Sequence, residues 1–361
     1  MAEVQKREKD SVLSDWKKDL CPEKGFGRVY EQSQNRRKEG YMIDFMTLRK
    51  ELNKNEVLFI QNLKWLKTNK KGYHYLLTGE FTPLNVRYDV DNSFVEISGS
   101  LMYYMQGHNF TFSKQAFIDA VKKIGNKLHL NLWDASVIEL EFGIIMEVEE
   151  TPETYIKSHH FKKKEKLVED AKMRDSKYFK WWKDGNVSIK MYDARRNLMT
   201  KVSKQIRDEI EDFNPNSKYL KFEVHYNKPH IVLNHRKEVK LSTLIMPTWI
   251  DRLKEDLLLQ YGRLETAIGL VPPKCKSDIS TADWFLRGII QNGLLQGKSP
   301  EYIKKMLYEI LRSYQVLNLY DRKARQRQFL EANRLIEYES KSYDLTDKII
   351  QAFSLHELWY K

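Results

Sequence analysis

With 361 residues, the chain is long enough for two or three domains that each bury their own core. Its 62 Lys and Arg outnumber its 50 Asp and Glu, and the net charge of +12 favours a polyanionic partner such as nucleic acid. Its two cysteines, Cys21 and Cys275, exclude a zinc knuckle or disulfide framework and favour a reducing, cytoplasmic location, and no apolar run approaches the ~20 residues of a membrane span.

Residues 1–41 predict a basic, weakly ordered N-terminal extension. Charged residues are dense there, and apolar residues follow no regular period over most of the segment. The spacing of Val12, Leu13, Trp16 and Leu20 also permits a short amphipathic helix that docks on the rest of the protein. Both interpretations stay open at this stage.

From Met42 the pattern changes to short apolar runs bounded by polar turns, which is typical of antiparallel strand pairs. The runs are Ile43 to Leu48, Val57 to Ile60, Tyr73 to Leu77 and Phe94 to Ile97. Ser113 then predicts the N-cap of a helix with one apolar face. We therefore expect an α+β domain built on an antiparallel sheet over residues 42–245.

Three later segments alternate apolar and polar side chains and predict strands with one polar face each. Glu139 and Glu141 project from the polar face of the first, and Lys190 and Tyr192 from that of the second. Lys221, Glu223 and His225 do so in the third. The opposing apolar sets are Ile138, Leu140, Phe142 and Ile144 in the first segment, Val187, Ile189 and Met191 in the second, and Leu220, Phe222 and Val224 in the third.

From Pro247 the strand signals fade and the remaining sequence predicts helices, so we place a domain boundary near residue 245. The segment Ser299-Pro300-Glu301 begins one helix by the cap-then-proline rule. Residues 321–338 predict another, whose Arg and Lys side chains either enter a DNA groove or meet only water. We therefore expect a helical C-terminal domain over residues 246–361.

The polar faces of the three strands carry the groups that phosphodiester transfer needs. Such a reaction uses an in-line nucleophile, a cation that neutralises charge on the non-bridging oxygens, and carboxylate or imidazole ligands for that cation. If the strands are neighbours, Mg²⁺ or Mn²⁺ would lie between the acids with Tyr192 beside it. Alternation alone favours a simpler interpretation, in which these are solvent-facing charges on a half-exposed sheet.

Other enzyme classes lack their sequence signatures here. The chain has no Walker loop, GxGxxG, HExxH or GxSxG motif, and no His-hydrophobe-His metal cluster. The sequence therefore disfavours nucleotide hydrolases, dinucleotide oxidoreductases, zincins and α/β-hydrolases.

Residues 42–245 also contain an ordered set of short motifs. Val95-Glu96-Ile97 precedes a small turn, Ser98-Gly99-Ser100, and then Gln106-Gly107-His108-Asn109. Four further segments accompany them, Met42 to Phe45, Ile138 to Glu141, Ile189 to Tyr192 and Leu220 to Glu223. Together they resemble the gene II family of filamentous-phage replication initiators and its plasmid relatives. The resemblance implies a replication-initiator (nickase) domain of that family.

The resemblance also implies roles for individual residues. Tyr192 matches the family's nucleophile, which becomes joined to the 5′ phosphate of the nicked strand. The implied ligands of Mg²⁺ or Mn²⁺ are Glu141 and Glu223, with His108 as a ligand or a transition-state donor and Glu139 and Glu96 as second choices. For His108 the alternative is an imidazole hydrogen-bonded in a turn, because Gly107 and Asn109 both favour turns.

Two positions after the nucleophile depart from the family pattern. The family has a lysine two positions after the tyrosine and an acid shortly beyond it, where this chain has Ala194 and Asn197. Lys190 on the same strand face, or Arg195, would then supply the missing positive charge. Glu141 also replaces the usual aspartate, which lengthens that side chain by one methylene.

The function that the resemblance implies is initiation of rolling-circle replication. One strand of a plasmid or phage origin is nicked, and the free 3′ hydroxyl primes a polymerase. The implied partners are origin DNA, duplex and single-stranded, with a host helicase and polymerase, and residues 246–361 take a DNA-binding or accessory role. A non-catalytic origin-binding regulator on the same fold and a mobilisation relaxase are the alternatives, and Ala194 and Asn197 keep the regulator open.

Overall fold

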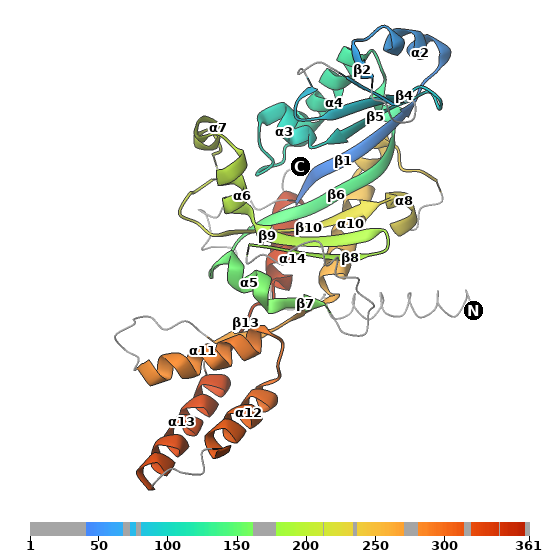
Figure 1. The fold of residues 1–361 in the computed structure, drawn as a ribbon. Coiled ribbons are helices and arrows are strands. Elements are labelled where there is room, and N and C mark those ends of the chain that lie inside the picture. Colours follow the sequence, from blue (N-terminus) through green and yellow to red (C-terminus); the bar gives the residue numbers. More distant parts are fainter. Residues whose placement is uncertain are drawn as a thin grey trace, which may run out of the picture. The chain divides into compact units, whose positions relative to one another are not determined.

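The computed structural model describes residues 41–67, 73–76, 81–161, 178–211, 213–233, 237–270, 281–313, 319–338 and 340–357 (Figure 1). Of the predicted N-terminal extension, 1–41, only Tyr41 falls within these residues, and it begins the first strand. Within the described residues, no helix combines the length and the apolar character that crossing a membrane requires.

An antiparallel sheet forms the centre of the fold, which confirms the predicted α+β class. The described part of the chain contributes nine strands to it, in the order β2-β3-β4-β5-β1-β6-β10-β9-β8. They are β1 (Tyr41–Glu51), β2 (Trp65–Lys67), β3 (Tyr73–Leu76), β4 (Asn85–Asp89), β5 (Phe94–Gly99), β6 (Ser136–Glu147), β8 (Phe179–Asp184), β9 (Val187–Asp193) and β10 (Tyr219–Asn227). Two short pairs lie outside it, β7 (His159–Phe161) with β11 (Leu264–Thr266), and β12 (Ile268–Leu270) with β13 (Ser340–Ser342).

Helices connect and cover the strands. They are α2 (Lys54–Gln61), α3 (Leu101–Gln106), α4 (Lys114–Leu128), the 3₁₀ turn η3 (Leu132–Asp134), α5 (Pro152–Ser158), α6 (Ala194–Lys201), α7 (Lys204–Asp208), α8 (Pro229–Val232), α9 (Leu241–Leu244), α10 (Pro247–Tyr261), α11 (Thr281–Leu295), α12 (Pro300–Ser313), α13 (Leu319–Tyr338) and α14 (Thr346–Glu357). Ser113 caps α4 as predicted, because its side chain accepts a hydrogen bond from Ala116 N at 3.3 Å.

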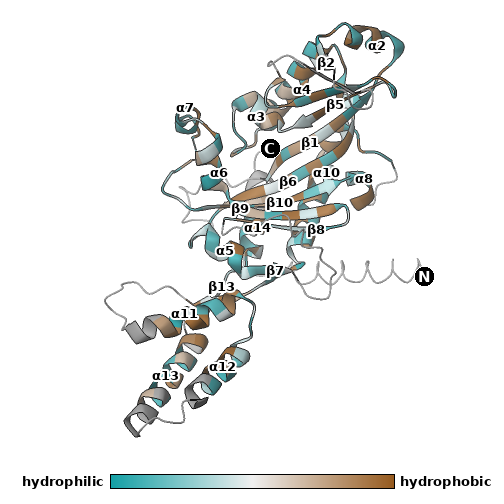
Figure 2. Ribbon diagram, viewed as in Figure 1, coloured by the Kyte–Doolittle hydropathy of each residue, from teal (hydrophilic) through white to brown (hydrophobic). Residues whose placement is uncertain are grey.

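One face of the sheet is buried against helices in a continuous apolar core. Apolar residues recur along the central strands (Figure 2), and those facing this core pack against α4, α10 and α14. Leu253 and Leu257 of α10 and Ile349 of α14 are fully buried there. The core therefore does not end at residue 245, where we expected a domain boundary. A separate cluster joins α11, α12 and α13 through Ile290, Leu294, Ile303, Leu307 and Leu335, together with neighbouring apolar residues.

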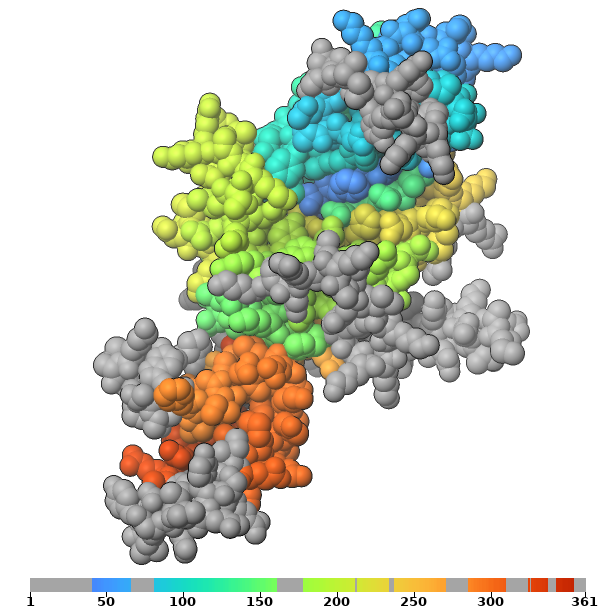
Figure 3. Space-filling view, viewed as in Figure 1, coloured from blue at the N-terminus to red at the C-terminus, as the bar shows by residue number. Residues whose placement is uncertain are grey.

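The opposite face is apolar at one end and polar beyond it. Met42, Ile145 and Tyr219 lie under Ala194 and Leu198 of α6 in a second, smaller core. Residues i and i+2 share a face, so polar side chains follow on the same face. These are Asp44 after Met42 on β1 and Lys221 after Tyr219 on β10, with Glu141 beyond Gly143 on β6. In the space-filling view, β1 (blue) is seen in a hollow between the region of α3 and that of α6 and α7 (Figure 3).

Two β-bulges set which side chains reach this polar face. The register of β1 against β6 shifts between Ile43 and Met46, so that Asp44 and Phe45 together oppose Glu141. A second shift in the same pair leaves Ile138 of β6 without a partner in β1, because Thr47 pairs with Glu139 and Leu48 with Val137. Val137, and not Ile138, consequently joins the core with Leu140, which corrects the predicted apolar set of that strand.

One predicted strand is a helix. Val57 to Ile60, expected as a strand, lies in α2. The side chain of Asn53 accepts hydrogen bonds from Asn55 N and Glu56 N, both at 3.0 Å, and Glu56 accepts one from Asn53 N at 2.8 Å. This capping box starts a helix and outweighs the strand propensity of the four apolar residues.

Candidate active site

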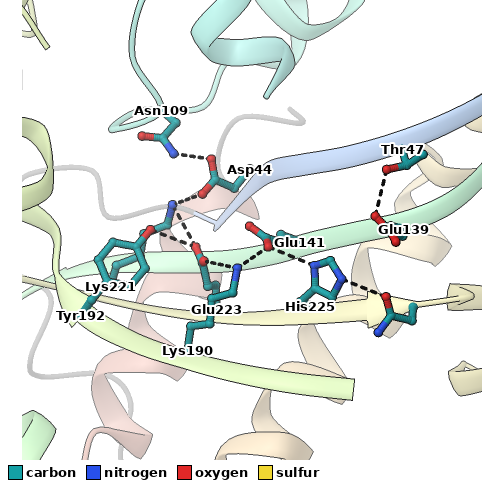
Figure 4. A network of polar contacts seen from close by, with 11 residues as sticks. Asp44, Thr47, Asn109, Glu139, Glu141, Lys190, Tyr192, Lys221, Glu223 and His225 are labelled. Carbon is teal, nitrogen blue, oxygen red and sulfur yellow. Dashed lines mark hydrogen bonds and ion pairs between the residues drawn. The ribbon is translucent and has the colours of Figure 1, made fainter. Parts of the chain in front are cut away.

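The three predicted polar strands lie side by side, in the order β6, β10, β9, and their polar side chains converge (Figure 4). Lys221 is directly opposite Tyr192, and Glu223 is opposite Lys190 on one side and Gly143 on the other. Gly143 is required there, because an added Cβ would lie 2.6 Å from the Glu223 Cβ. The glycine thus leaves room for Glu223 between β6 and β9.

Three carboxylates meet at the centre of this face. Asp44, Glu141 and Glu223 each place one oxygen within 4.8 Å of the others. Asp44 reaches the group because of the bulge in β1. Carboxylate oxygens are the ligands that Mg²⁺ and Mn²⁺ prefer, and since two oxygens at ~2.1 Å from one cation are at most ~4.2 Å apart, a small inward shift of the side chains would suffice to hold one. The donor set therefore fits a small divalent cation.

Two lysines balance much of the negative charge. Lys221 Nζ lies 2.5 Å from Asp44 Oδ2 and 3.1 Å from Glu223 Oε2. Lys190 Nζ pairs with Glu141 and lies 3.5 Å from Glu223 Oε1. Burial opposes the charge of both ammonium groups, but the acids outweigh it and raise the pKa of each lysine, that of Lys221 well above its usual value. Both lysines are therefore charged at neutral pH.

Glu141 and His225 are hydrogen-bonded to each other beside the lysines. Burial alone would raise the pKa of Glu141, but the hydrogen bond from His225 and the charge of Lys190 lower it to about 2. His225 Nδ1 lies 3.0 Å from Glu141 Oε1, and Nε2 lies 3.1 Å from Asn227 Oδ1. Burial opposes charge on the ring, yet the bond to Glu141 raises the pKa of His225. The ring is thus held between two acceptors, which suits a doubly protonated imidazolium.

Tyr192 is half-buried and bonded to the third acid. Its hydroxyl donates to Glu223 Oε2 at 3.1 Å, and the Phe179 ring lies 6.1 Å from its own. Burial and the charge of Glu223 raise the pKa of Tyr192 well above its usual value. Burial raises the pKa of Glu223 to about 7. The charge of Lys221 lowers this pKa, and the charge of Asp44 raises it further. A weakly acidic phenol is therefore paired with a carboxylate that can hold a proton near neutrality.

The Gln-Gly-His-Asn segment contacts the cluster through its asparagine. Asn109 Nδ2 donates to Asp44 Oδ1. His108 Nδ1 lies 3.3 Å from both Phe110 N and Gln106 Nε2, and since both are donors, the ring proton is on Nε2. Burial lowers the pKa of His108, and the residue is outside the group of three carboxylates. Its contacts are those of a turn-stabilising imidazole.

The other predicted site residues lie elsewhere. Glu139 accepts a hydrogen bond from Thr47 Oγ1 at 3.0 Å and is outside the carboxylate group. Glu96 is bonded to two arginines on β1 and β4. Arg195 is exposed, and its Nε donates to Pro215 O rather than to any group of the cluster.

Three contributors to the site were missed by the sequence reasoning, namely Asp44, Lys221 and Asn109. Lys221 lies directly opposite Tyr192 on the neighbouring strand β10. Ala194 is buried in the second core at the start of α6, where a lysine would have to bury its charge. Asp193 caps this helix by accepting from Arg196 N at 2.8 Å.

A further tyrosine lies beside the cluster on α3. Burial and then the charge of Asp44 raise the pKa of Tyr103. Its hydroxyl is buried and has no hydrogen-bond partner among the described residues. An unsatisfied buried hydroxyl is costly, so this group lowers the stability of the fold in the absence of a partner.

Comparison of the chain with models of protein families, with curated proteins and with solved structures finds no match. The function therefore has to be argued from the site itself.

Proposed function

We propose that the chain is a metal-assisted DNA-nicking and joining enzyme, a rolling-circle replication initiator in which Tyr192 is the nucleophile. The observation that carries the proposal is the hydrogen bond from Tyr192 to Glu223 inside a cluster of three carboxylates and two lysines. This is the set of groups that transfer at a phosphodiester requires. The net charge of +12 suits a nucleic-acid substrate.

The reaction would run as a single displacement at phosphorus. Tyr192 Oη attacks the scissile phosphate while its proton passes to Glu223 Oε2, the atom to which the hydroxyl already donates. The bond from phosphorus to the 3′ oxygen breaks, and this oxygen takes a proton from water. The products are a 5′-phosphotyrosine and a 3′ hydroxyl.

Charge is stabilised by groups on both sides of the tyrosine. Lys221 Nζ lies 5.6 Å from the centre of the Tyr192 ring, where it stabilises negative charge on the phenolic oxygen. A divalent cation held by Asp44, Glu141 and Glu223 would neutralise the non-bridging oxygens of the phosphate. Glu223 Oε2 accepts the hydrogen bond from Tyr192, whereas Oε1 faces Lys190. Proton transfer can therefore use Oε2 while Oε1 binds the cation.

A non-catalytic origin-binding protein is the second candidate, favoured by Ala194 and Asn197. The position of Lys221 weakens it, since a lysine reaches the tyrosine from the neighbouring strand. In the catalytic case, the free 3′ hydroxyl would prime a polymerase at a plasmid or phage origin with the help of a helicase.

Transfer of a label to the protein tests the proposal. The full chain is incubated with Mn²⁺ and a single-stranded oligonucleotide pool of random sequence carrying a 3′ label. Because the tyrosine becomes joined to the 5′ phosphate of the downstream fragment, the 3′ label should follow the protein on a denaturing gel. Tyr192→Phe should abolish the adduct, whereas the control Tyr178→Phe, whose ring lies under Arg196, should keep it. DNA binding without any adduct would support the regulator instead.

A further inference from the structure

Glu96, a second-choice metal ligand by sequence, is surrounded by two arginines. Only 7% of this residue is exposed. Arg49 Nη2 lies 3.2 Å from Glu96 Oε2, and Arg87 Nη2 lies 2.6 Å from Oε1. Each carboxylate oxygen is thus bonded to a different guanidinium. The acid holds two cations in place, and the trio keeps a net charge of +1.

Arg49 has donors to spare. Its guanidinium lies 4.4 Å from the centre of the Phe94 ring, which fixes its plane. Glu96 takes one of the five N–H groups, and Nε is buried without a partner among the described residues, so only the outer N–H groups can reach an anion. The side chain nevertheless remains 35% exposed, and that of Arg87 30%. An anion that reaches the exposed end of the Arg49 guanidinium, beside Arg87, would find preorganised donors.

The arginine pair shares a face with the acid cluster. Thr47 bonds to Glu139, and Glu139 and Glu141 are two residues apart on β6, so all three side chains lie on the polar face. Arg49 is two residues beyond Thr47 on β1 and lies on the same face. Arg49 is five positions beyond Asp44, a distance of about 16 Å along the strand. A single DNA strand can span this distance in a few nucleotides.

We propose that Arg49 and Arg87, held by Glu96, bind a backbone phosphate of the DNA strand whose scissile phosphate lies at Tyr192. This inference rests on the proposed function and adds a second contact point, which would set the path of the unpaired strand across the sheet. The positive trio favours a phosphate, and guanidinium groups suit its oxygens better than a lysine would. Glu96 is then a positioning residue and not a metal ligand.

Binding of a labelled single-stranded oligonucleotide of mixed sequence, measured in EDTA against salt concentration, tests the subsite. Arg49→Gln should weaken binding about tenfold. The negative slope of log K against log salt should become shallower by about 0.7. Glu96→Gln should make the slope steeper, because it removes the neutralising charge while its amide oxygen can still accept from one arginine. Lys157→Gln, which removes the same charge from an exposed pair with Glu153, is the matched control and should change neither value.

The outcomes separate the subsite from the proposed function. If the 3′ label still follows the protein but Arg49→Gln leaves affinity and slope unchanged, the subsite is refuted and the nicking activity stands. If the unaltered chain forms no adduct and binds no oligonucleotide, both proposals fall. Thermal unfolding checks that each variant is folded. Should Arg49→Gln not fold, Arg87→Gln replaces it, and unchanged affinity and slope in that variant overturn the subsite.

Discussion

Tyr192 and Glu223 lie on neighbouring strands, two residues out of direct register, and the tyrosine hydroxyl donates to Glu223 Oε2 at 3.1 Å. Lys221 stands between them in the register, opposite Tyr192 and two residues before Glu223. Glu223 raises and Lys221 lowers the pKa of Tyr192, and Lys221 also lowers that of Glu223. The pair is therefore best probed by changing pH and one partner at a time.

Glu223 should make the cation-free protein less stable at alkaline pH. Burial raises its pKa to about 7 in the folded chain, above the ordinary value of 4.5. Between these values the folded state binds more protons than the unfolded state, so stability falls as pH rises through about 7. In EDTA, Glu223→Gln should flatten the loss of unfolding free energy between about pH 5 and pH 8. Urea titrations at several pH values measure this, and a decline as steep as in the unaltered protein would contradict the assignment.

Asp44 should be required for cation binding, and Glu139 should not. Asp44 contributes an oxygen to the group of three, whereas Glu139 is bonded to Thr47 outside it. Calorimetric titration with Mn²⁺ should show binding by the unaltered chain and by Glu139→Gln, and at least tenfold weaker binding by Asp44→Asn. Equal losses in the two variants would mean that charge on this face, and not the three-oxygen site, attracts the cation.

Lys221 should stabilise the fold mainly by neutralising two buried acids. Its side chain is 2% exposed, and replacing it with Met leaves Asp44 and Glu223 without their shared ammonium group. Removing one partner of a buried ion pair typically costs about 3–5 kcal/mol of unfolding free energy. Lys190→Met is the control and should cost less, because that side chain is 23% exposed. Mn²⁺ should restore part of the loss in Lys221→Met by replacing the missing charge, and no recovery would argue against a cation at this site.

Apolar runs and alternation of side chains predicted six strands of the central sheet, β1, β3, β5, β6, β9 and β10, but not β2, β4 or β8. From the sequence alone, the strands of Glu141, Tyr192 and Glu223 could only be assumed to be adjacent. The structure places them side by side in the order β6, β10, β9. Their period of two is a local property, so it is readable without knowing the fold. The convergence of Lys190 with the two acids follows from the same pattern.

The bulge that brings in Asp44 was harder to predict. Ile43 and Met46 both face the core although three positions separate them, and this break in alternation is visible in the sequence only once the strand is known. The role of Lys221 was missed for a related reason. It depends on cross-strand register, which pairs Lys221 with Tyr192 and is set by long-range contacts rather than by local pattern.

Tyr103 should tolerate the loss of its hydroxyl, in contrast to Tyr226. The Tyr103 hydroxyl is buried without a partner among the described residues, so Tyr103→Phe removes an unsatisfied group and should leave stability unchanged or raise it by up to about 1 kcal/mol. Tyr226 is fully buried and donates to Asp256 Oδ2 at 2.8 Å, so Tyr226→Phe should cost about 1–3 kcal/mol by depriving that carboxyl of a donor. Urea denaturation of the two variants under identical conditions gives the comparison. A loss in Tyr103→Phe as large as in Tyr226→Phe would show that the Tyr103 hydroxyl has a strong partner, such as an ordered water between it and the acid cluster.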